Sequence, residues 1–525
     1  MMLKKLTGFA VSAALLTACG GTVENPQPGN QQEGDSYEIV TPGKADNYYS
    51  NVAKEFELTG TVDVAMSEED YSDETERNHL VSQRLTAVGL YLTTYLTDKF
   101  RGIDSDDSGE IEDDEVFFEN DDYGGFKAMV RNHSVETVDV GEADQGSYAV
   151  DFTIDVAGPK QLPEMLLEDG GERAEGGVAF EVQMPEGAKS DRESAGSGTI
   201  RDFDPESYDG ELEAVELVAK PQPKIRDAYP HYNAFMEDGV YDITLFYGYD
   251  YNESRSDLQG AEEAFTTLRR QGFETPASSF DSLDYDSGPF VKEVSRLSAN
   301  GPERVEIEVR VFHADMFEGE RSRQSELAIE ELTSRDIFFY NGHAGPYYGF
   351  YLDPDNDAFI NYTEIEGFDF EQDRQQLFIA QGCQTYSQYA DMMYANPAKS
   401  EENLDVITTV NYSYGQGTMT LLKNLIAVDE ESHRPVSFYD IVEDLNSEFY
   451  NRYKDVFYGV MGIDGNPQVH PYANTEAIGE GCERDADCGG SPEANVCVEG
   501  TCAIRTLAEG SCPAGSSFGY LGQGS

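Results

Sequence analysis

Two short segments, DIFFYNGHAG (336–345) and LFIAQGC (377–383), carry most of the information about the fold. Each is an apolar run of strand length that leads into glycine and a reactive side chain, His343 in the first segment and Cys383 in the second. Short apolar runs bounded by turn residues are typical of strands buried in a parallel sheet. Because parallel strands present their carboxyl ends at one edge of the sheet, we expect His343 and Cys383 to lie together there.

The surrounding sequence alternates between strand and helix patterns. Further apolar strands are predicted at VYDITLFYGY (240–249), VEIEVRVF (305–312) and VITTV (406–410). Helices are predicted at ELAIEEL (326–332) and at 257–271, the latter beginning at a capping box of Ser256 and Gln259 and ending at Gly272. The pattern predicts an α/β fold over residues 235–475, with a mostly parallel sheet flanked by helices.

A cysteine and a histidine at one sheet edge have a specific chemical use. A thiol is activated as a nucleophile when an imidazole lies within reach to take its proton. The neighbouring Gly342, Gly345 and Gly382 let a backbone approach closely and leave N–H groups that can stabilise an oxyanion. We therefore expect Cys383 and His343 to act as a catalytic pair.

With these motifs the chain resembles the caspase-like cysteine peptidases, a group that includes caspases, gingipains, clostripain, legumain and separase. The segment QGCQT (381–385) looks like the caspase nucleophile segment Q-A-C-x-G, and His343 lies 40 residues before Cys383, near the family's interval. LQGAEEAFTTLRRQGF (258–273) also looks like the first helix of that fold. The resemblance covers about 237–450 and implies that Cys383 is the nucleophile and His343 the acid/base.

The same resemblance implies an oxyanion hole and leaves alternatives open. The N–H of Cys383, with that of Ala344 or Gly345 and with Gly382 alongside, would bind the oxyanion. The chain departs from the family because Ala344 separates the histidine from glycine and Thr385 replaces a glycine. The alternatives are a non-enzymatic calcium-binding surface lipoprotein, whose inactive caspase-like domain serves binding or scaffolding, and a thiol acyltransferase or transpeptidase.

The segment DSDDSGEIEDDE (104–115) matches the calcium loop of EF-hand proteins. That loop places oxygen ligands at positions 1, 3, 5, 7, 9 and 12, with glycine at position 6. The expected ligands are Asp104, Asp106, Ser108, the Glu110 carbonyl, Glu112 and Glu115. The preceding residues 79–100 have helical periodicity, so we expect Ca²⁺ to bind after a helix.

A second segment, DPDNDAFINYTE (353–364), matches the same loop. Its expected ligands are Asp353, Asp355, Asp357, the Phe359 carbonyl, Asn361 and Glu364. Ala358 replaces the usual glycine, and a left-handed conformation there would cost about 1 kcal/mol. The preceding GHAGPYYGFYL is not helical, so the loop is expected on another fold. Since it lies between His343 and Cys383, its Ca²⁺ is expected to hold this connection in place.

The N-terminus predicts export. Residues 1–18 have two lysines, an apolar stretch and small residues, as in a signal peptide. LTAC, ending at Cys19, resembles the lipobox of bacterial lipoproteins, in which the cysteine is lipidated; plain cleavage beside a chance cysteine is the alternative. Residues 19–40 form a polar tether, and Gly20 carries no signal for inner-membrane retention. The expected location is the outer membrane or cell surface, with the lipid as the only membrane contact.

Composition limits the partners. The 525 residues include 36 basic and 101 acidic side chains, a formal net charge of −65. Such a charge disfavours nucleic acid and anionic membranes, and favours divalent cations or basic ligands. With the resemblance, it suggests a polypeptide substrate cleaved after a basic residue. The length predicts two or three domains, of which residues 41–230 form an α+β domain containing the first calcium loop.

The remaining cysteines and histidines lead to further predictions. Cys482, Cys488, Cys497 and Cys502 predict a two-disulfide module within 480–513, more readily than a zinc site. Cys512 is left over, and Cys383 is left unpaired. The other histidines are expected on the surface; these are His79, His133, His231, His313, His433 and His470.

Overall fold

The computed structural model describes most of the chain after residue 45. The described residues are 46–99, 130–131, 136–144, 146–190, 203–222, 225, 227–250, 254–298, 301–318, 320–344, 349–353, 358–410, 413, 415, 417–428, 435–453, 457–465, 471, 479–488, 495–498 and 500–504. The chain divides into two compact units, Met1–Ile39 and Val40–Ser525, and the described residues belong to the second. The signal peptide, Cys19, the tether, the loop 104–115 and Cys512 lie outside the described residues.

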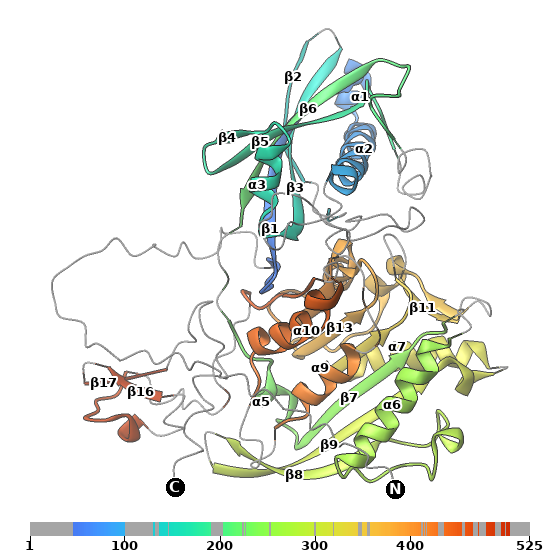
Figure 1. Ribbon diagram of the computed structural model, residues 1–525, viewed down its shortest axis with the longest axis vertical. Coiled ribbons are helices and arrows are strands. Elements are labelled where there is room, and N and C mark those ends of the chain that lie inside the picture. Colours follow the sequence, from blue (N-terminus) through green and yellow to red (C-terminus); the bar gives the residue numbers. More distant parts are fainter. Residues whose placement is uncertain are drawn as a thin grey trace, which may run out of the picture. The chain divides into compact units, whose positions relative to one another are not determined.

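Residues 46–222 contain a six-stranded antiparallel sheet with strand order β2-β3-β1-β6-β5-β4 (Figure 1). Its strands are β1 (Ala53–Ala65), β2 (Glu136–Asp144), β3 (Ser147–Pro159), β4 (Glu172–Ala174), β5 (Gly177–Pro185) and β6 (Leu212–Pro221). Its helices are α1 (Glu68–Ser72), α2 (Glu74–Lys99) and α3 (Leu162–Glu168). This part of the chain mixes helices and antiparallel strands.

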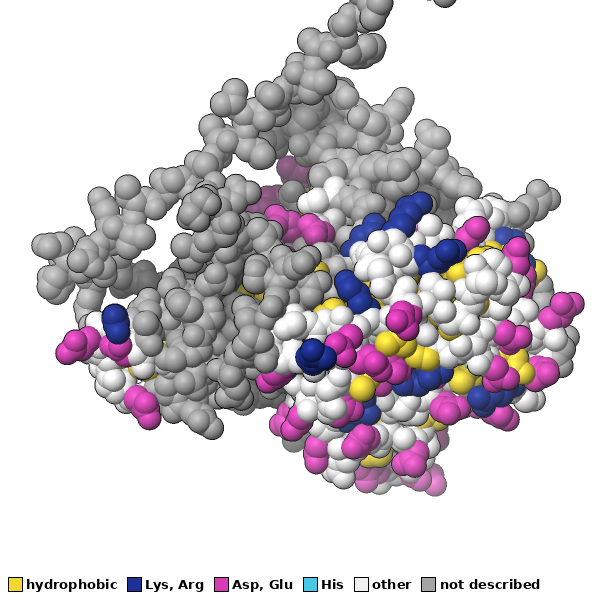
Figure 2. Space-filling view, turned by 90° about the horizontal axis from the view of Figure 1, so that it is seen from below, with side chains coloured by type: hydrophobic (Ala, Val, Ile, Leu, Met, Phe, Trp, Pro, Cys, Tyr) yellow, Lys and Arg dark blue, Asp and Glu magenta, His cyan; other side chains and the backbone are white. Residues whose placement is uncertain are grey.

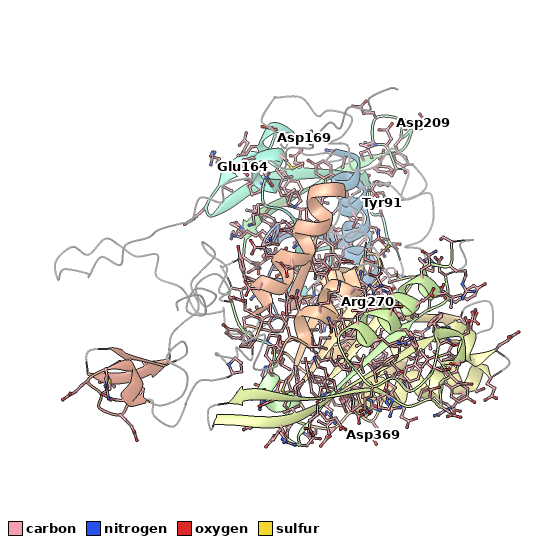
Figure 3. All side chains as sticks on the ribbon, turned by 60° about the horizontal axis from the view of Figure 1, so that its bottom comes forward. Tyr91, Glu164, Asp169, Asp209, Arg270 and Asp369 are labelled. Atoms are coloured by element: carbon pink, nitrogen blue, oxygen red, sulfur yellow. A yellow bond between two sulfur atoms is a disulfide. The ribbon has the colours of Figure 1, made fainter. Side chains whose placement is uncertain are left out.

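One face of this sheet is covered by helix. In β1, Phe56, Leu58 and Val62 are buried, whereas Thr61 and Asp63 are exposed, which is the alternation of a strand with one buried face. Helix α2 contributes the buried side chains Leu85, Val88, Leu92 and Leu96 to the same core. The α2 residue Tyr95 also donates a 2.7 Å hydrogen bond to Asp169, which follows α3 and is labelled in Figure 3.

Residues 227–465 contain a seven-stranded mixed sheet, ordered β15-β14-β13-β10-β7-β9-β8 (Figure 1). Its strands are β7 (Val240–Tyr247), β8 (Phe290–Ser298), β9 (Gly301–His313), β10 (Ile337–Asn341), β13 (Gln376–Gln381), β14 (Leu404–Thr409) and β15 (Tyr458–Met461). The five strands from β14 to β9 are parallel, and the two edge strands are antiparallel to them. The predicted mixed α/β architecture with parallel pairs is confirmed.

Both faces of the seven-stranded sheet are buried. In β10, Ile337 and Phe339 belong to one core, whereas Phe338 and Tyr340 belong to the other. The helices are α5 (Tyr232–Phe235), α6 (Ser256–Arg270), α7 (Arg321–Ser334), α8 (Tyr389–Tyr394), α9 (Gly417–Leu425) and α10 (Phe438–Tyr453). Burial on both sides explains why the parallel strands are continuous apolar runs rather than alternating ones.

Short elements fill the connections of this sheet. A hairpin of β11 (Phe350–Asp353) and β12 (Ala358–Ile360) follows β10. The 3-10 helices are Phe280–Ser282, Ala314–Phe317, Tyr362–Gly367, Thr385–Ser387 and Asp485–Cys488. In the sequence, the hairpin lies between the segment that carries His343 and the segment that carries Cys383. The turn Thr385–Ser387 follows Cys383.

The C-terminal module is built on two disulfides, Cys482–Cys497 and Cys488–Cys502. They support a small hairpin of β16 (Asn495–Val498) and β17 (Thr501–Ile504). The predicted disulfide pairing of these four cysteines is confirmed, and the structure adds its connectivity. The sequence could not supply that connectivity, because four cysteines allow three pairings.

Two surface properties bear on membrane and ligand contacts. Within the described part of the chain, no helix combines the length and apolar character needed to span a bilayer. On the face seen in Figure 2, Lys and Arg side chains lie among Asp and Glu side chains. The described residues on this face therefore present charges of both signs.

Candidate functional site

The two predicted reactive residues follow neighbouring parallel strands. The β10–β13 register pairs Asn341 with Gln381, so His343 and Cys383 each lie two residues beyond a paired position. The pairing extends past the strands, because the Gly342 N–H donates to the Gln381 carbonyl at 3.2 Å. Both residues thus lie at the carboxyl-terminal edge of the sheet, as the sequence predicted.

Close contact between the two turns explains Gly382. A Cβ on Gly382 would lie 2.5 Å from the Ala344 Cβ and 3.0 Å from the Gly342 carbonyl oxygen. Such distances are too short for a side chain, so glycine is required at this position. The backbone before Cys383 therefore packs directly against the residue that follows His343.

Tyr340 connects the histidine turn to the β11–β12 hairpin. Its hydroxyl donates to the His343 carbonyl oxygen and accepts a 2.8 Å hydrogen bond from the Tyr351 N–H. Burial raises the pKa of Tyr340, and a negative charge on Cys383 raises it further. The phenol is therefore neutral, and it fixes the histidine backbone beside the thiol.

His343 has an acidic partner that the sequence analysis missed. Its Nε2 lies 3.3 Å from Oδ1 of Asp250, a buried residue that follows the parallel strand β7. A carboxylate can only accept, so the tautomer that this contact favours carries its proton on Nε2 and leaves Nδ1 as the basic nitrogen of the ring. Asp250 is a polar residue just beyond a parallel strand, so the rule that located His343 and Cys383 could have located it too.

Asp250 is itself held by the first turn of α6. Its Oδ2 accepts a 3.0 Å hydrogen bond from the Ser256 N–H and a second one from the Ser256 hydroxyl. The predicted capping box is therefore wrong. Arg255, with φ of 45°, precedes the helix, and Gln259 instead donates to the Ser254 carbonyl. The Asp250 carboxylate takes the capping role, where the helix dipole also favours a negative charge.

The turn after Cys383 is sharp and tightly bonded. Gln384 takes a left-handed conformation with φ of 60°, a strained state for a residue with a Cβ. The buried Thr385 hydroxyl then donates to the Ala380 carbonyl at 3.0 Å and accepts from the Thr409 N–H at 2.9 Å. Threonine at this position therefore joins β13 and β14 behind the thiol, which is a structural reason for the departure from glycine.

The candidate oxyanion donors differ in availability. The Gly382 N–H donates to the Ala380 carbonyl at 3.0 Å, so in this structure it is not available to a ligand. Among the hydrogen bonds of the described residues, none comes from the Ala344 N–H. Gly345 lies outside the described residues.

The reactive side chains are within reach of solvent. Cys383 is partly exposed and forms no disulfide, and the His343 side chain is 34% exposed. By contrast, His231 and His313 are buried, and the expectation that they lie on the surface is wrong. His313 ends β9 and packs on Phe280, and His231 Nε2 lies 4.0 Å from the buried Asp405.

The second predicted calcium loop falls on the β11–β12 hairpin. Asp353 ends β11, whereas Asp355 and Asp357 lie outside the described residues. Asn361 and Glu364 form a capping box for the 3-10 helix Tyr362–Gly367, with the Asn361 N–H donating to Glu364 at 2.7 Å. Asn361 and Glu364 thus cap a short helical turn in this structure.

Position 6 of this loop differs from the expectation. Positive φ among the described non-glycine residues occurs at Arg255, Asp373 and Gln384, and Ala358 is not one of them. Ala358 is instead a buried β12 residue paired with Asp353, so the predicted strain is absent. Within the described ranges, the side chains grouped closely enough for a metal are Cys482, Cys488 and Cys502, which already form disulfides.

The hairpin also contacts the candidate site. The Tyr249 N–H, next to Asp250, donates to the Leu352 carbonyl at 2.7 Å. A Cβ on Gly248 would lie 2.1 Å from the Tyr351 carbonyl oxygen. The hairpin backbone therefore bonds both to the segment that carries Asp250 and to the hydroxyl of Tyr340.

Comparison of the chain with protein families, curated proteins and solved structures finds no match.

Proposed function

We propose that the protein is a surface-anchored, calcium-binding cysteine endopeptidase of caspase-like type. The observation that carries this proposal is the position of Cys383, His343 and Asp250 after three parallel strands, β13, β10 and β7. A nucleophile, a base and a group that orients the base are the parts that acyl transfer requires.

The proposed reaction uses these residues in two steps. The Cys383 thiol attacks the peptide carbonyl carbon, and its proton passes to Nδ1 of His343. Asp250 holds the imidazole and stabilises its charged form, while the Cys383 and Ala344 N–H groups bind the oxyanion. His343 then protonates the leaving amine, leaving a thioester. Water, deprotonated by His343, hydrolyses this thioester and restores the thiol.

The calcium sites and location are parts of the same proposal. Ca²⁺ would bind the loops 104–115 and 353–364, whose sequences supply the oxygen ligands of EF-hand loops. Lipidation at Cys19 would hold the protein at the outer membrane or cell surface. The substrate would be a polypeptide, and the acidic composition favours cleavage after a basic residue.

Active-site labelling tests the proposal. Full-length protein is treated with tagged arginyl and lysyl acyloxymethyl ketones, with and without Ca²⁺, and the modified residue is found by mass spectrometry. Stoichiometric labelling of Cys383, lost in Cys383→Ala and His343→Ala, is expected. The four described tail cysteines form disulfides and serve as internal controls.

The same experiment separates the alternatives. An absence of labelling by any peptide ketone, in folded protein with bound Ca²⁺, would favour the non-enzymatic surface lipoprotein. Ligated rather than hydrolysed peptide products would identify an acyltransferase or transpeptidase, because an amine then replaces water in the second step.

A further inference from the structure

A buried arginine joins three parts of the chain. The Arg131 Nε donates to both carboxylate oxygens of Asp391, at 3.0 and 3.1 Å, and its Nη2 also contacts Asp46 at 2.5 Å. The Arg131 side chain is only 2% exposed. Burial by itself would lower the pKa of Arg131, but Asp391 and Asp46 raise it above the usual range, so the guanidinium stays charged.

A buried glutamate lies beside this arginine. Glu55 accepts a 2.7 Å hydrogen bond from the Tyr386 hydroxyl and a 3.0 Å hydrogen bond from the Tyr48 N–H. Its Oε1 is 4.0 Å from Nη1 of Arg131, and its side chain is 1% exposed. The Tyr48 ring packs edge-on against Tyr386, with ring centroids 5.0 Å apart.

These contacts run from the six-stranded sheet to the segment that follows Cys383. Glu55 is a residue of β1, and the Arg131 N–H donates to the Asp155 carbonyl of β3 at 2.9 Å. Their partners Tyr386 and Asp391 lie three and eight residues after Cys383, in the 3-10 turn and in α8. Tyr386 is therefore held by Glu55 of the six-stranded sheet, and Asp391 by Arg131, whose backbone is bonded to that sheet.

We propose that Arg131 and Glu55 are positioning residues for Cys383. The six-stranded sheet is then needed for the geometry of the active site and is not merely an accessory domain. This inference rests on the proposed peptidase function. Buried ion pairs contribute little net stability, but removing one member leaves an uncompensated charge, so the network favours one arrangement of the chain. Nucleophile placement is sensitive to shifts of about 1 Å, which can change rates by roughly a hundredfold.

The test uses full-length variants that remove single contacts. Tyr386→Phe removes the hydroxyl bonded to Glu55, and Asp391→Asn removes the charge that faces Arg131. The matched control is Tyr241→Phe, which deletes an equally buried hydroxyl bonded to the Leu425 carbonyl, outside the network. Melting temperatures show that each variant is folded.

The measured quantities are kinact and KI for arginyl or lysyl acyloxymethyl ketones, and the rate of Cys383 alkylation by iodoacetamide. For Tyr386→Phe and Asp391→Asn, we expect kinact to fall about tenfold, equivalent to about 1.4 kcal/mol, with KI unchanged. Alkylation by iodoacetamide should change less than about twofold, because it needs no aligned peptide carbonyl. If both variants match Tyr241→Phe in kinact, the inference is overturned.

A second measurement keeps the inference testable if the peptidase proposal fails. Should the ketones not label the wild-type protein, hydrogen exchange of residues 383–391 becomes the readout. Faster exchange there in Tyr386→Phe and Asp391→Asn, but not in Tyr241→Phe, would support positioning of this segment. Equal exchange in all three variants would refute it, independently of catalysis.

Discussion

Replacing Thr385 by valine should loosen the turn that carries Cys383. Valine keeps the shape of threonine but removes the hydroxyl, which bonds to the Ala380 carbonyl at 3.0 Å and to the Thr409 N–H at 2.9 Å. Thr385 is fully buried, so water cannot replace these bonds without rearrangement. The Ala380 carbonyl keeps its hydrogen bond from the Gly382 N–H, so only the Thr409 N–H loses its partner. A buried polar group left without a partner costs about 1–3 kcal/mol, which suggests a loss of about 2 kcal/mol.

The matched variant is Thr385→Ser, which keeps the hydroxyl and loses one methyl group, a cost of about 1 kcal/mol. For a domain of 150–250 residues, each kcal/mol lowers Tm by about 2–4 °C. Thr385→Val should therefore melt about 4–8 °C below wild type, and Thr385→Ser only about 2–4 °C below it. Differential scanning calorimetry measures both. If valine lowers Tm no more than serine, the hydroxyl does not hold this turn.

Three further predictions concern the acidic residues. Asp250→Asn should lower the rate at which the ketones label Cys383 by about a hundredfold, because an amide does not hold His343 as a carboxylate does. The control is Asp315→Asn, a change at an exposed carboxylate that should leave the labelling rate unchanged. Equal labelling rates in the two variants would show that Asp250 is not part of the site. Burial raises the pKa of Asp227 to about 7, so between about pH 4 and 7 the native state binds more protons than the unfolded state and this residue makes stability fall as pH rises. The stability advantage of Asp227→Asn should thus grow by about 1.4 kcal/mol per pH unit over that window and level off above it, and a pH-independent difference in denaturation midpoints would contradict this. Calcium titration calorimetry should find one fewer Ca²⁺ site in a variant that combines Asp353→Asn with Glu364→Gln. If a chelator removes Ca²⁺ without slowing the ketone labelling of Cys383, activity does not depend on the metal.

The strands could be predicted from the sequence because the composition of each strand depends on whether its two faces are buried. The apolar runs of β7, β10, β13 and β14 are buried on both faces, so their composition reports their environment directly. His343 and Cys383 could be placed together because parallel strands share a carboxyl edge. The same reasoning, applied once more, would have included Asp250.

Other features depend on contacts between residues distant in the chain. Glu55 and Tyr386 are 331 residues apart, and no local pattern marks them as partners. His231 and His313 were expected on the surface because neither has a sequence context like that of His343, but packing between elements buries both. The start of α6 was wrongly assigned to a capping box, because a carboxylate outside the helix takes the serine hydroxyl.

The two disulfides of the C-terminal module overlap along the chain, since Cys488 lies between Cys482 and Cys497, and Cys497 lies between Cys488 and Cys502. One backbone break anywhere from Cys482 to Cys502 therefore leaves both fragments covalently joined through at least one S–S bond. A nick within the module would change its mass by one water molecule without releasing the C-terminal residues. On a surface exposed to proteolysis, the end of the chain would stay attached until a second cut or a reductant released it.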